Sequence, residues 1–328
     1  MKKIMNNPEN IVEEMLNGFA IANNNIINLE KKQRIIYRKN KSEKKVGLIS
    51  GGGTGHEPSH AGFVGKGMLD AAVCGSVFTS PGPEQILEAI RLADNGMGVL
   101  MIVKNYSGDI MNFEIAQELA ILEGIEVESV IVCDDIAVED SLYTQGRRGV
   151  AGTILVHKIL GYFAENGLNL SELKTIADSV VNKIKTVGIA LSGVTTPEGG
   201  KESFILSEST IEFGVGIHGE PGYSTNKLEP SKVLAKELIN KILVHIDSSS
   251  KYVGVLVNGL GGTPLMEQYV FYSDVEKILS EKGYEIVFSK IGNYMTALDM
   301  EGISLTIMDL ENKDYLDALV SKVSTVAW

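Results

Sequence analysis

A cluster of glycines directly follows a short apolar run in the stretch Val46-Gly47-Leu48-Ile49-Ser50-Gly51-Gly52-Gly53-Thr54-Gly55-His56. An apolar run of this length is typical of a buried strand. Glycines directly after a strand indicate a backbone that turns sharply and approaches another group closely. Because ligands of open α/β sheets bind at the carboxyl ends of strands, this loop is the first candidate site.

Three known loop patterns lie close to this stretch, and none of them fits well. A P-loop needs Lys and then Ser or Thr after its last glycine, but His56 follows Gly55. A dinucleotide-binding loop needs its third glycine where His56 stands. The zinc-protease pattern H-E-x-x-H is present at residues 56–60, but Pro58 fits only the start of a helix. The two histidines of that pattern are therefore not expected on one helical face, and we expect no metal site in this chain.

Strands and helices alternate in the first half of the chain. Residues 46–50, 98–103 and 129–133 have the pattern of buried strands, and residues 83–93 and 110–123 that of helices. This alternation predicts a doubly wound, mainly parallel sheet with right-handed crossovers.

Polar loops follow the three strands, at residues 51–56, 104–109 and 134–135. We expect these loops to meet at one edge of the sheet, because parallel strands that share crossovers of one hand end on the same side. This convergence predicts a small-molecule site in the first half of the chain.

The pattern changes near residue 185. Beyond this point apolar strands occur singly or in pairs, at residues 187–191, 211–217, 252–257 and 303–307. We therefore divide the chain into two α/β domains. Residues 1–185 form the domain that carries the glycine loop, His56 and Asp109, and residues 186–328 form a mixed-sheet domain that carries His218.

The composition argues against several classes of protein. A chain of 328 residues corresponds to about two domains of ordinary size. Its 30 basic and 42 acidic residues give a net charge of −12, which argues against nucleic acid or an anionic membrane as a partner. The longest apolar run, residues 97–103, is too short to span a bilayer, and residues 1–7 lack the pattern of a secretory signal. With only two cysteines and no paired spacing, we expect a cytoplasmic protein with reduced thiols.

A few polar side chains at strand ends are candidates for chemistry. His56 and His218 both lie among glycines, so each could act through its imidazole or hydrogen-bond within its own turn. Asp109 precedes a helix and is either a site carboxylate or a helix cap. Lys104 could react with a carbonyl group, hold an anion or be solvated. The arginines at 147–148 either face an anion or form part of a solvated turn, and we favour the turn.

Longer motifs carry a resemblance to a known family. They are Ser50-Gly51-Gly52-Gly53-Thr54-Gly55-His56-Glu57-Pro58, Lys104-Asn105-Tyr106-Ser107-Gly108-Asp109, Ser141-Leu142-Tyr143-Thr144-Gln145-Gly146-Arg147-Arg148-Gly149, Glu212-Phe213-Gly214-Val215-Gly216-Ile217-His218-Gly219-Glu220-Pro221-Gly222 and Asn258-Gly259-Leu260-Gly261-Gly262-Thr263-Pro264. In these motifs, which run through nearly the whole chain, the sequence resembles the substrate-binding (K) subunit of dihydroxyacetone kinases.

The resemblance implies roles for the candidate residues. His218 would bind the ketone of dihydroxyacetone covalently as a hemiaminal, which selects ketones and aldehydes over glycerol. His56 and Asp109 would act on the hydroxyl group that receives phosphate, one accepting its proton and the other orienting it. The remaining positions that match substrate-lining residues of the family are Gly53, Thr54, Gly55 and Lys104.

The resemblance also implies partners. In the phosphotransferase-system type of this kinase, ADP or ATP and magnesium are held by a separate L subunit, and an M subunit relays phosphate from a phosphohistidine. We therefore expect no cofactor on this chain, which ends at Trp328 without a fused L domain, and the family implies a homodimer. The alternative is a non-catalytic paralogue that binds dihydroxyacetone through His218 and acts as a transcriptional coactivator. Such a binder would not need His56 or Asp109, so their presence favours the kinase. Without the resemblance, a Schiff-base enzyme using Lys104 is a third alternative.

Overall fold

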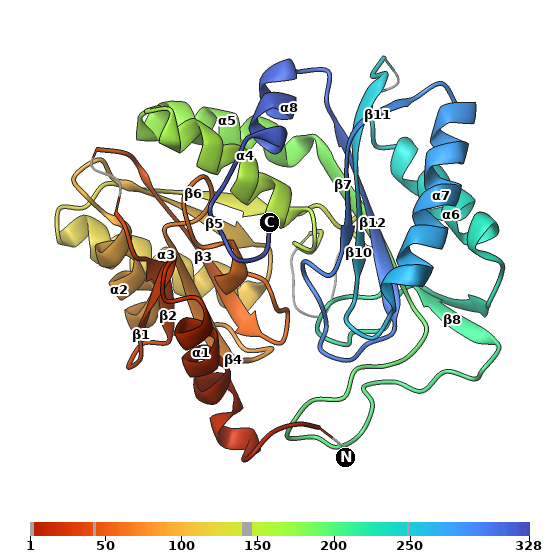
Figure 1. Ribbon diagram of the computed structural model, residues 1–328, viewed down its shortest axis with the longest axis horizontal. Helices are drawn as coiled ribbons and strands as arrows, with labels where there is room; N and C mark the ends of the chain where they lie inside the picture. The colour runs from red at the N-terminus through yellow and green to blue at the C-terminus, as the bar shows by residue number, and fades with distance from the viewer. Residues whose placement is uncertain (1–2, 42–43, 140–145, 248) are drawn as a thin grey trace.

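Two six-stranded β-sheets, each packed against helices, make up the structure (Figure 1). The computed structural model describes residues 3–41, 44–139, 146–247 and 249–328. The first sheet has the strand order β1 (Ile27–Glu30), β2 (Ile35–Arg38), β4 (Ala71–Val77), β3 (Gly47–Thr54), β5 (Val99–Lys104) and β6 (Val127–Val132). The second has the order β11 (Glu285–Gly292), β10 (Tyr252–Gly259), β12 (Gly302–Asp309), β7 (Ile184–Ala190), β8 (Thr210–Phe213) and β9 (Ser224–Lys227). The helices are α1 (Ile11–Ala22), α2 (Pro83–Ala93), α3 (Ser107–Leu122), α4 (Thr153–Glu165), α5 (Leu170–Asn182), α6 (Ser231–Leu243), α7 (Leu265–Glu281) and α8 (Lys313–Val320), with short 3-10 turns at Pro8–Asn10 and Ala61–Phe63.

The first sheet is mainly parallel and has helices on both faces. β4, β3, β5 and β6 run parallel, and β2 and β1 extend the sheet as antiparallel strands. Every residue of β3 and β5 is buried, which explains why apolar residues and glycines predominate in both strands. Alternate residues face opposite ways, so that Ile49 packs with α2 and α3, whereas Leu48 packs with α4 and α5. The expected doubly wound, mainly parallel sheet is confirmed.

The second sheet is mixed, as expected. Only β10 and β11 run parallel, and its other neighbouring strands are antiparallel. Helices α6 and α7 cover one face through a buried cluster that includes Leu238 and Phe271. The expected boundary between residues 185 and 186 falls inside β7, which begins at Ile184.

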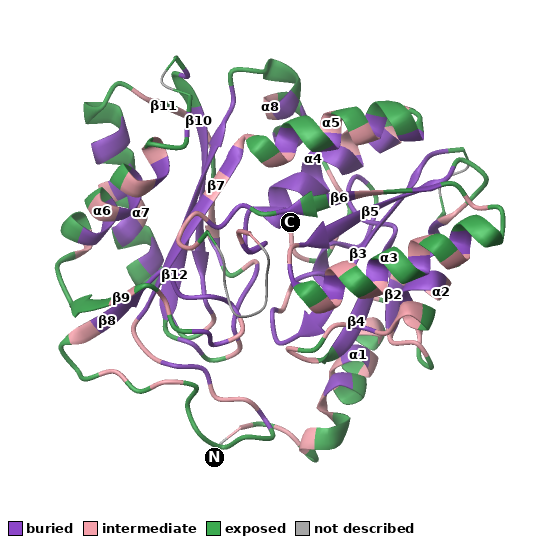
Figure 2. Cartoon of the chain, turned by 180° about the vertical axis from the view of Figure 1, so that it is seen from behind, coloured by how far each residue is buried: buried purple, intermediate pink, exposed green. Residues whose placement is uncertain are grey.

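A continuous buried core joins the two halves. Figure 2 shows the buried residues concentrated in the strands of both sheets, with exposed residues on the outer sides of the helices. One cluster contains Leu48 and Ile154 from the first half together with Leu256 and Met308 from the second. No helix within the described ranges combines the length and apolar character needed to cross a bilayer.

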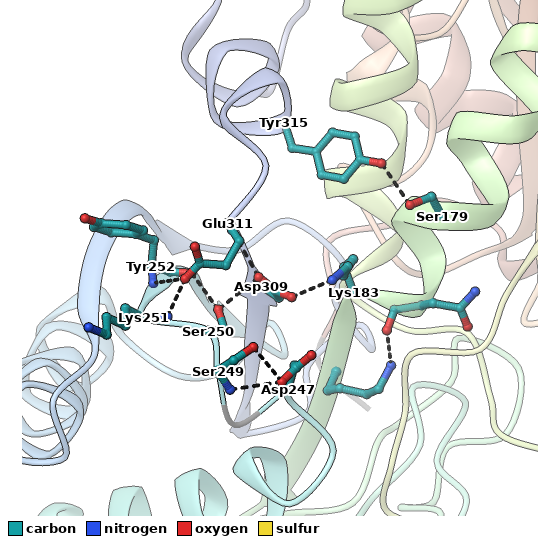
Figure 3. Close-up of polar contacts among 12 residues, drawn as sticks. Ser179, Lys183, Asp247, Ser249, Ser250, Lys251, Tyr252, Asp309, Glu311 and Tyr315 are labelled. Carbon is teal, nitrogen blue, oxygen red and sulfur yellow. Dashed lines mark hydrogen bonds and ion pairs between the residues drawn. The ribbon is translucent and has the colours of Figure 1, made fainter.

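Polar contacts at the end of β12 also tie the halves together (Figure 3). The Asp309 carboxylate accepts hydrogen bonds from Lys183 Nζ at 2.7 Å and from Ser250 Oγ at 2.9 Å. Nearby, the hydroxyl of Tyr315 on α8 lies 3.0 Å from the hydroxyl of Ser179 on α5. Because Lys183 directly follows α5, these contacts fix the C-terminal strand and helix against the first half.

Candidate functional site

A cavity of about 360 Å³ lies where loops from the two halves meet. The loops come from the carboxyl ends of β3, β4 and β5 and from the segment after β8. The cavity is lined by Gly53, Phe78, Ser80, Tyr106, Ser107, Gly108, Asp109 and His218. Two of the three strand-end loops expected to meet do so here, those after β3 and β5. The loop after β4 lines the cavity in place of residues 134–135, and the second half adds His218.

The glycine loop lets charged groups come close to the backbone of β3. A Cβ atom at Gly52 would lie 2.9 Å from Lys104 Nζ and 3.5 Å from Asp109 Oδ2, so any other residue would displace this pair. The Thr54 side chain does not line the cavity, because it is buried and donates to the carbonyl of Gly75 at 2.6 Å. Thr54 thereby anchors the loop to β4.

Asp109 is held by two neighbours rather than serving as a helix cap. It lies in the first turn of α3, where the helix dipole favours a carboxylate, and Tyr106 occupies the cap position. Ser80 Oγ donates a hydrogen bond to Asp109 Oδ1, and Lys104 Nζ lies 3.5 Å from Oδ2. Both charged side chains are almost fully buried. The arrangement fixes an acceptor group at the cavity wall.

His56 is fully buried beside the cavity and has a defined tautomer. Its Nδ1 lies 2.7 Å from the carbonyl oxygen of Thr296, which can only accept, so Nδ1 carries the hydrogen. Burial, with the nearby His218 and Lys104, lowers the pKa of His56 well below its usual value. The imidazole is therefore neutral, with a lone pair on Nε2. Nε2 is buried and has no hydrogen-bond partner among the described residues.

His218 is oriented by Glu220. The backbone N–H of His218 donates to one carboxylate oxygen of Glu220 at 2.8 Å, and the ring Nδ1 lies 3.4 Å from the other. Burial acts to raise the pKa of Glu220, but the hydrogen bond and charge of His218, aided by Arg148, outweigh it and lower the pKa to about 2. An ionised Glu220 accepts from Nδ1–H, which leaves the Nε2 lone pair of His218 free to act as a nucleophile.

Aromatic rings surround His218. The ring centroids of Tyr106, His56 and Phe78 lie 4.5, 4.7 and 5.4 Å from that of His218, all edge-to-face. Phe78 also stacks on His56 at 5.1 Å. These contacts fix the ring plane of His218.

The interpretation of residues 147–148 as a solvated turn was wrong for Arg148. Arg148 is almost fully buried, pairs with Asp135 at 2.6 Å and donates to the Gly214 carbonyl at 2.7 Å. Its partners Asp135 and Gly214 are 13 and 66 residues away in sequence, so the local pattern of a charged residue among glycines indicated an exposed turn. Arg148 holds the segment that leads to His218. The neighbouring positions 141–145 of the same motif lie outside the described residues.

The predicted residues fall into three groups. Gly53, Asp109 and His218 line the cavity. His56 and Lys104 lie directly behind these, and Thr54 and Gly55 support the loop. The other lining residues were not predicted as site residues: they are Phe78 and Ser80, and Tyr106, Ser107 and Gly108 from the motif at residues 104–109.

His60, the second histidine of the H-E-x-x-H pattern, contacts a different partner. Its Nδ1 lies 2.9 Å from Nε2 of His157 on α4. Among the described residues, no group of three or more His, Cys, Asp or Glu side chains is arranged to hold a metal ion.

The fold and the cavity define a two-sheet α/β protein with a small polar site between its halves. The Dak1 domain matches residues 17–327, so the chain belongs to the Dak1 domain family. The resemblance to the dihydroxyacetone kinase K subunit is thereby confirmed.

Three known proteins illustrate this relationship. The chain is 55% identical to the PTS-dependent dihydroxyacetone kinase, dihydroxyacetone-binding subunit DhaK of Lactococcus lactis, over 100% of this chain and 99% of that protein. It is 44% identical to the DhaKLM operon coactivator DhaQ of the same organism, over 99% of this chain and 100% of that protein. The solved structure of the dihydroxyacetone kinase of C. freundii superimposes with a TM-score of 0.92 and 37% identity, over 100% of this chain and 60% of that chain.

Proposed function

We propose that this chain is the dihydroxyacetone-binding subunit of a cytoplasmic, phosphotransferase-system-dependent dihydroxyacetone kinase. The observation that carries the proposal is the full-length match to a subunit of that name at 55% identity. The cavity supports it, because a nucleophilic histidine and a fixed carboxylate line the same small space.

His218 captures the ketone in this proposal. The Nε2 lone pair forms a bond to the carbonyl carbon, and the π electrons of the carbonyl move onto its oxygen. That oxygen gains a proton while the ring gives up the one on Nδ1, so the product is a neutral hemiaminal. Glu220 stabilises the positive charge that the ring carries between these two proton transfers. A covalent bond suits a ligand that offers little surface to bury.

Asp109 accepts the proton of the hydroxyl group that receives phosphate. It lines the cavity, whereas His56 lies behind the wall. Ser80 and Lys104 hold the Asp109 carboxylate in place. His56 offers an acceptor at Nε2 and orients the bound molecule by hydrogen bonding.

Other parts of the enzyme supply the phosphate. We propose that ADP or ATP and magnesium arrive on an L subunit that docks over the cavity, that an M subunit recharges the nucleotide, and that this chain forms a homodimer. The proposal of a separate L subunit is supported by the Lactococcus lactis relative, because that protein is named as one subunit of a dihydroxyacetone kinase.

The alternative is a coactivator that binds dihydroxyacetone without phosphorylating it, favoured by the 44% identity to DhaQ. The test is reconstitution of the purified chain with an L subunit carrying its nucleotide. We expect dihydroxyacetone phosphate to form with the wild type, and to be lost with Asp109→Asn and His218→Ala. In parallel, ¹³C NMR of dihydroxyacetone labelled at the ketone carbon reports the hemiaminal. An adduct without any phosphorylated product would identify a sensor and refute the kinase proposal.

A further inference from the structure

The loop between β11 and β12, residues 293–301, lies over the glycine loop that carries His56, and we call it the clasp. The N–H of Leu298 donates to the carbonyl of Gly55 at 2.8 Å, and that of Thr296 to the carbonyl of His56 at 3.2 Å. In return, His56 Nδ1–H donates to the carbonyl of Thr296 at 2.7 Å. A histidine of the first half is thus fixed by main-chain atoms of the second half.

The carbonyl of Thr296 determines which ring nitrogen of His56 is available. A neutral imidazole has one protonated nitrogen, and the hydrogen bond that this nitrogen makes selects the tautomer. With the carbonyl in place, Nδ1 carries the hydrogen and Nε2 keeps its lone pair. A displaced carbonyl would allow the opposite tautomer, in which Nε2–H can no longer accept a hydrogen bond.

Asn258, at the end of β10, holds this clasp. Its side chain is fully buried, and its oxygen accepts from the N–H groups of Tyr294 and Met295, both at 2.9 Å. Its amide nitrogen donates to the carbonyl of Met295 at 2.8 Å and to Ser304 Oγ at 3.1 Å. Three of these four bonds go to the main chain directly before Thr296. No other amino acid of this size has an acceptor and two donors in this geometry.

We propose that Asn258 is a positioning residue for the proposed kinase reaction. By fixing residues 294–295 it places the Thr296 carbonyl, which holds His56 in the tautomer with an accepting Nε2. Asn258 itself does not line the cavity. The inference rests on the proposed function for its catalytic consequence, but the tautomer can be measured independently.

The decisive measurement is two-bond ¹H–¹⁵N correlation of ¹⁵N-histidine-labelled protein, which distinguishes protonated from unprotonated ring nitrogens. The chain has 5 histidines, and His56→Gln assigns the signals of His56. In the wild type we expect His56 to be protonated at Nδ1 only. A wild-type His56 protonated at Nε2 would overturn the proposal without any variant.

Asn258→Asp is the sharpest variant, because it keeps the size and the acceptors but loses both donors. Its carboxylate repels the Met295 carbonyl, so the clasp should shift and the Nε2–H tautomer of His56 should become detectable. In the reconstituted assay, we expect kcat to fall at least about tenfold, with KM changing less than about threefold. Ser304→Ala is the matched control, since it removes a side-chain partner of Asn258 that lies outside the clasp, and we expect it to leave the tautomer unchanged.

Two outcomes keep the test decisive. If Asn258→Asp does not fold, Asn258→Ala is read by the same spectrum, and an unchanged His56 tautomer in a folded variant refutes the proposal. If the wild type never phosphorylates dihydroxyacetone, the proposed function fails, while the tautomer shift still decides the role of Asn258.

Discussion

Arg148 and Asp135 form a buried ion pair, and Arg148 also donates a hydrogen bond to the segment that leads to His218. Arg148 Nη2 lies 2.6 Å from Asp135 Oδ2, and the same nitrogen donates to the Gly214 carbonyl at 2.7 Å. His56 is held in turn by the Thr296 carbonyl of the opposite half. Each histidine of the site is therefore positioned by a residue from the other half of the chain.

Removing Arg148 alone should destabilise the fold strongly. Arg148→Met leaves the carboxylate of Asp135 buried without its partner, which costs about 3–5 kcal/mol of the free energy of unfolding. Urea denaturation at neutral pH measures the loss. The control is Arg91→Met, whose ion pair with Glu123 is exposed to solvent, so we expect its loss to change the free energy of unfolding only slightly. A loss no larger than that of the control would show that the Arg148 pair is not desolvated as the structure indicates.

Gly216→Ala should disrupt the orientation of His218 more than it disrupts the fold. A Cβ atom at this position would overlap the carboxylate of Glu220, which must then swing away from the His218 ring. We expect hemiaminal formation to weaken at least about tenfold, since a lost hydrogen bond to a charged group is worth about 1.5–3 kcal/mol. Titration with ¹³C-labelled dihydroxyacetone measures this.

Gly18→Ala is the matched control for that variant. Gly18 lies in α1 with open space around the position of a Cβ atom, so alanine should stabilise the chain by about 0.5–1 kcal/mol and leave the adduct unchanged. Equal adduct affinity in the two variants would argue against the role of Glu220.

The fold could be predicted from the sequence better than the residues that hold the site histidines in position. Glycines after a buried strand and the alternation of strands and helices predicted the first sheet, because both signals are local. The strand at residues 27–30 was missed, since it is short and lies within a polar stretch. The Thr296 carbonyl could not be predicted at all, because every residue carries a carbonyl and only the fold shows which one faces His56. Arg148 and Asn258 have partners that are distant in sequence, so their buried roles needed coordinates.

Glu220 should make stability depend on pH in the acidic range. Its pKa falls from 4.5 to about 2 on folding, so the ionised form stabilises the native state. This contribution is complete above about pH 4.5 and is lost as the pH falls toward 2; a shift of this size corresponds to about 3 kcal/mol. Glu220→Gln should therefore be less stable than the wild type at pH 7, with a difference that narrows at pH 3.5.

Urea unfolding of both chains at several pH values tests this dependence. Glu276→Gln, at an exposed position of α7, is the control and should differ from the wild type by less than about 0.5 kcal/mol throughout. A difference for Glu220→Gln that stays constant between pH 7 and pH 3.5 would contradict the lowered pKa.

Ser80→Ala should reduce turnover without abolishing the adduct. Ser80 Oγ donates to Asp109 Oδ1, and Ser80 itself lines the cavity. Without the Ser80 hydroxyl, the Asp109 carboxylate keeps its ion pair with Lys104 but loses the hydrogen bond to Oδ1. The carboxylate is then held less firmly at the cavity wall. Because hydrogen bonds to charged groups are worth about 1.5–3 kcal/mol, we expect kcat in the reconstituted assay to fall about ten- to hundredfold. Thr79→Ala removes a neighbouring hydroxyl that donates to the Val77 carbonyl and, within the described residues, does not contact Asp109; it should keep kcat within about twofold of the wild type. If Ser80→Ala instead prevents hemiaminal formation while kcat per bound substrate is unchanged, Ser80 acts on the ketone and not through Asp109.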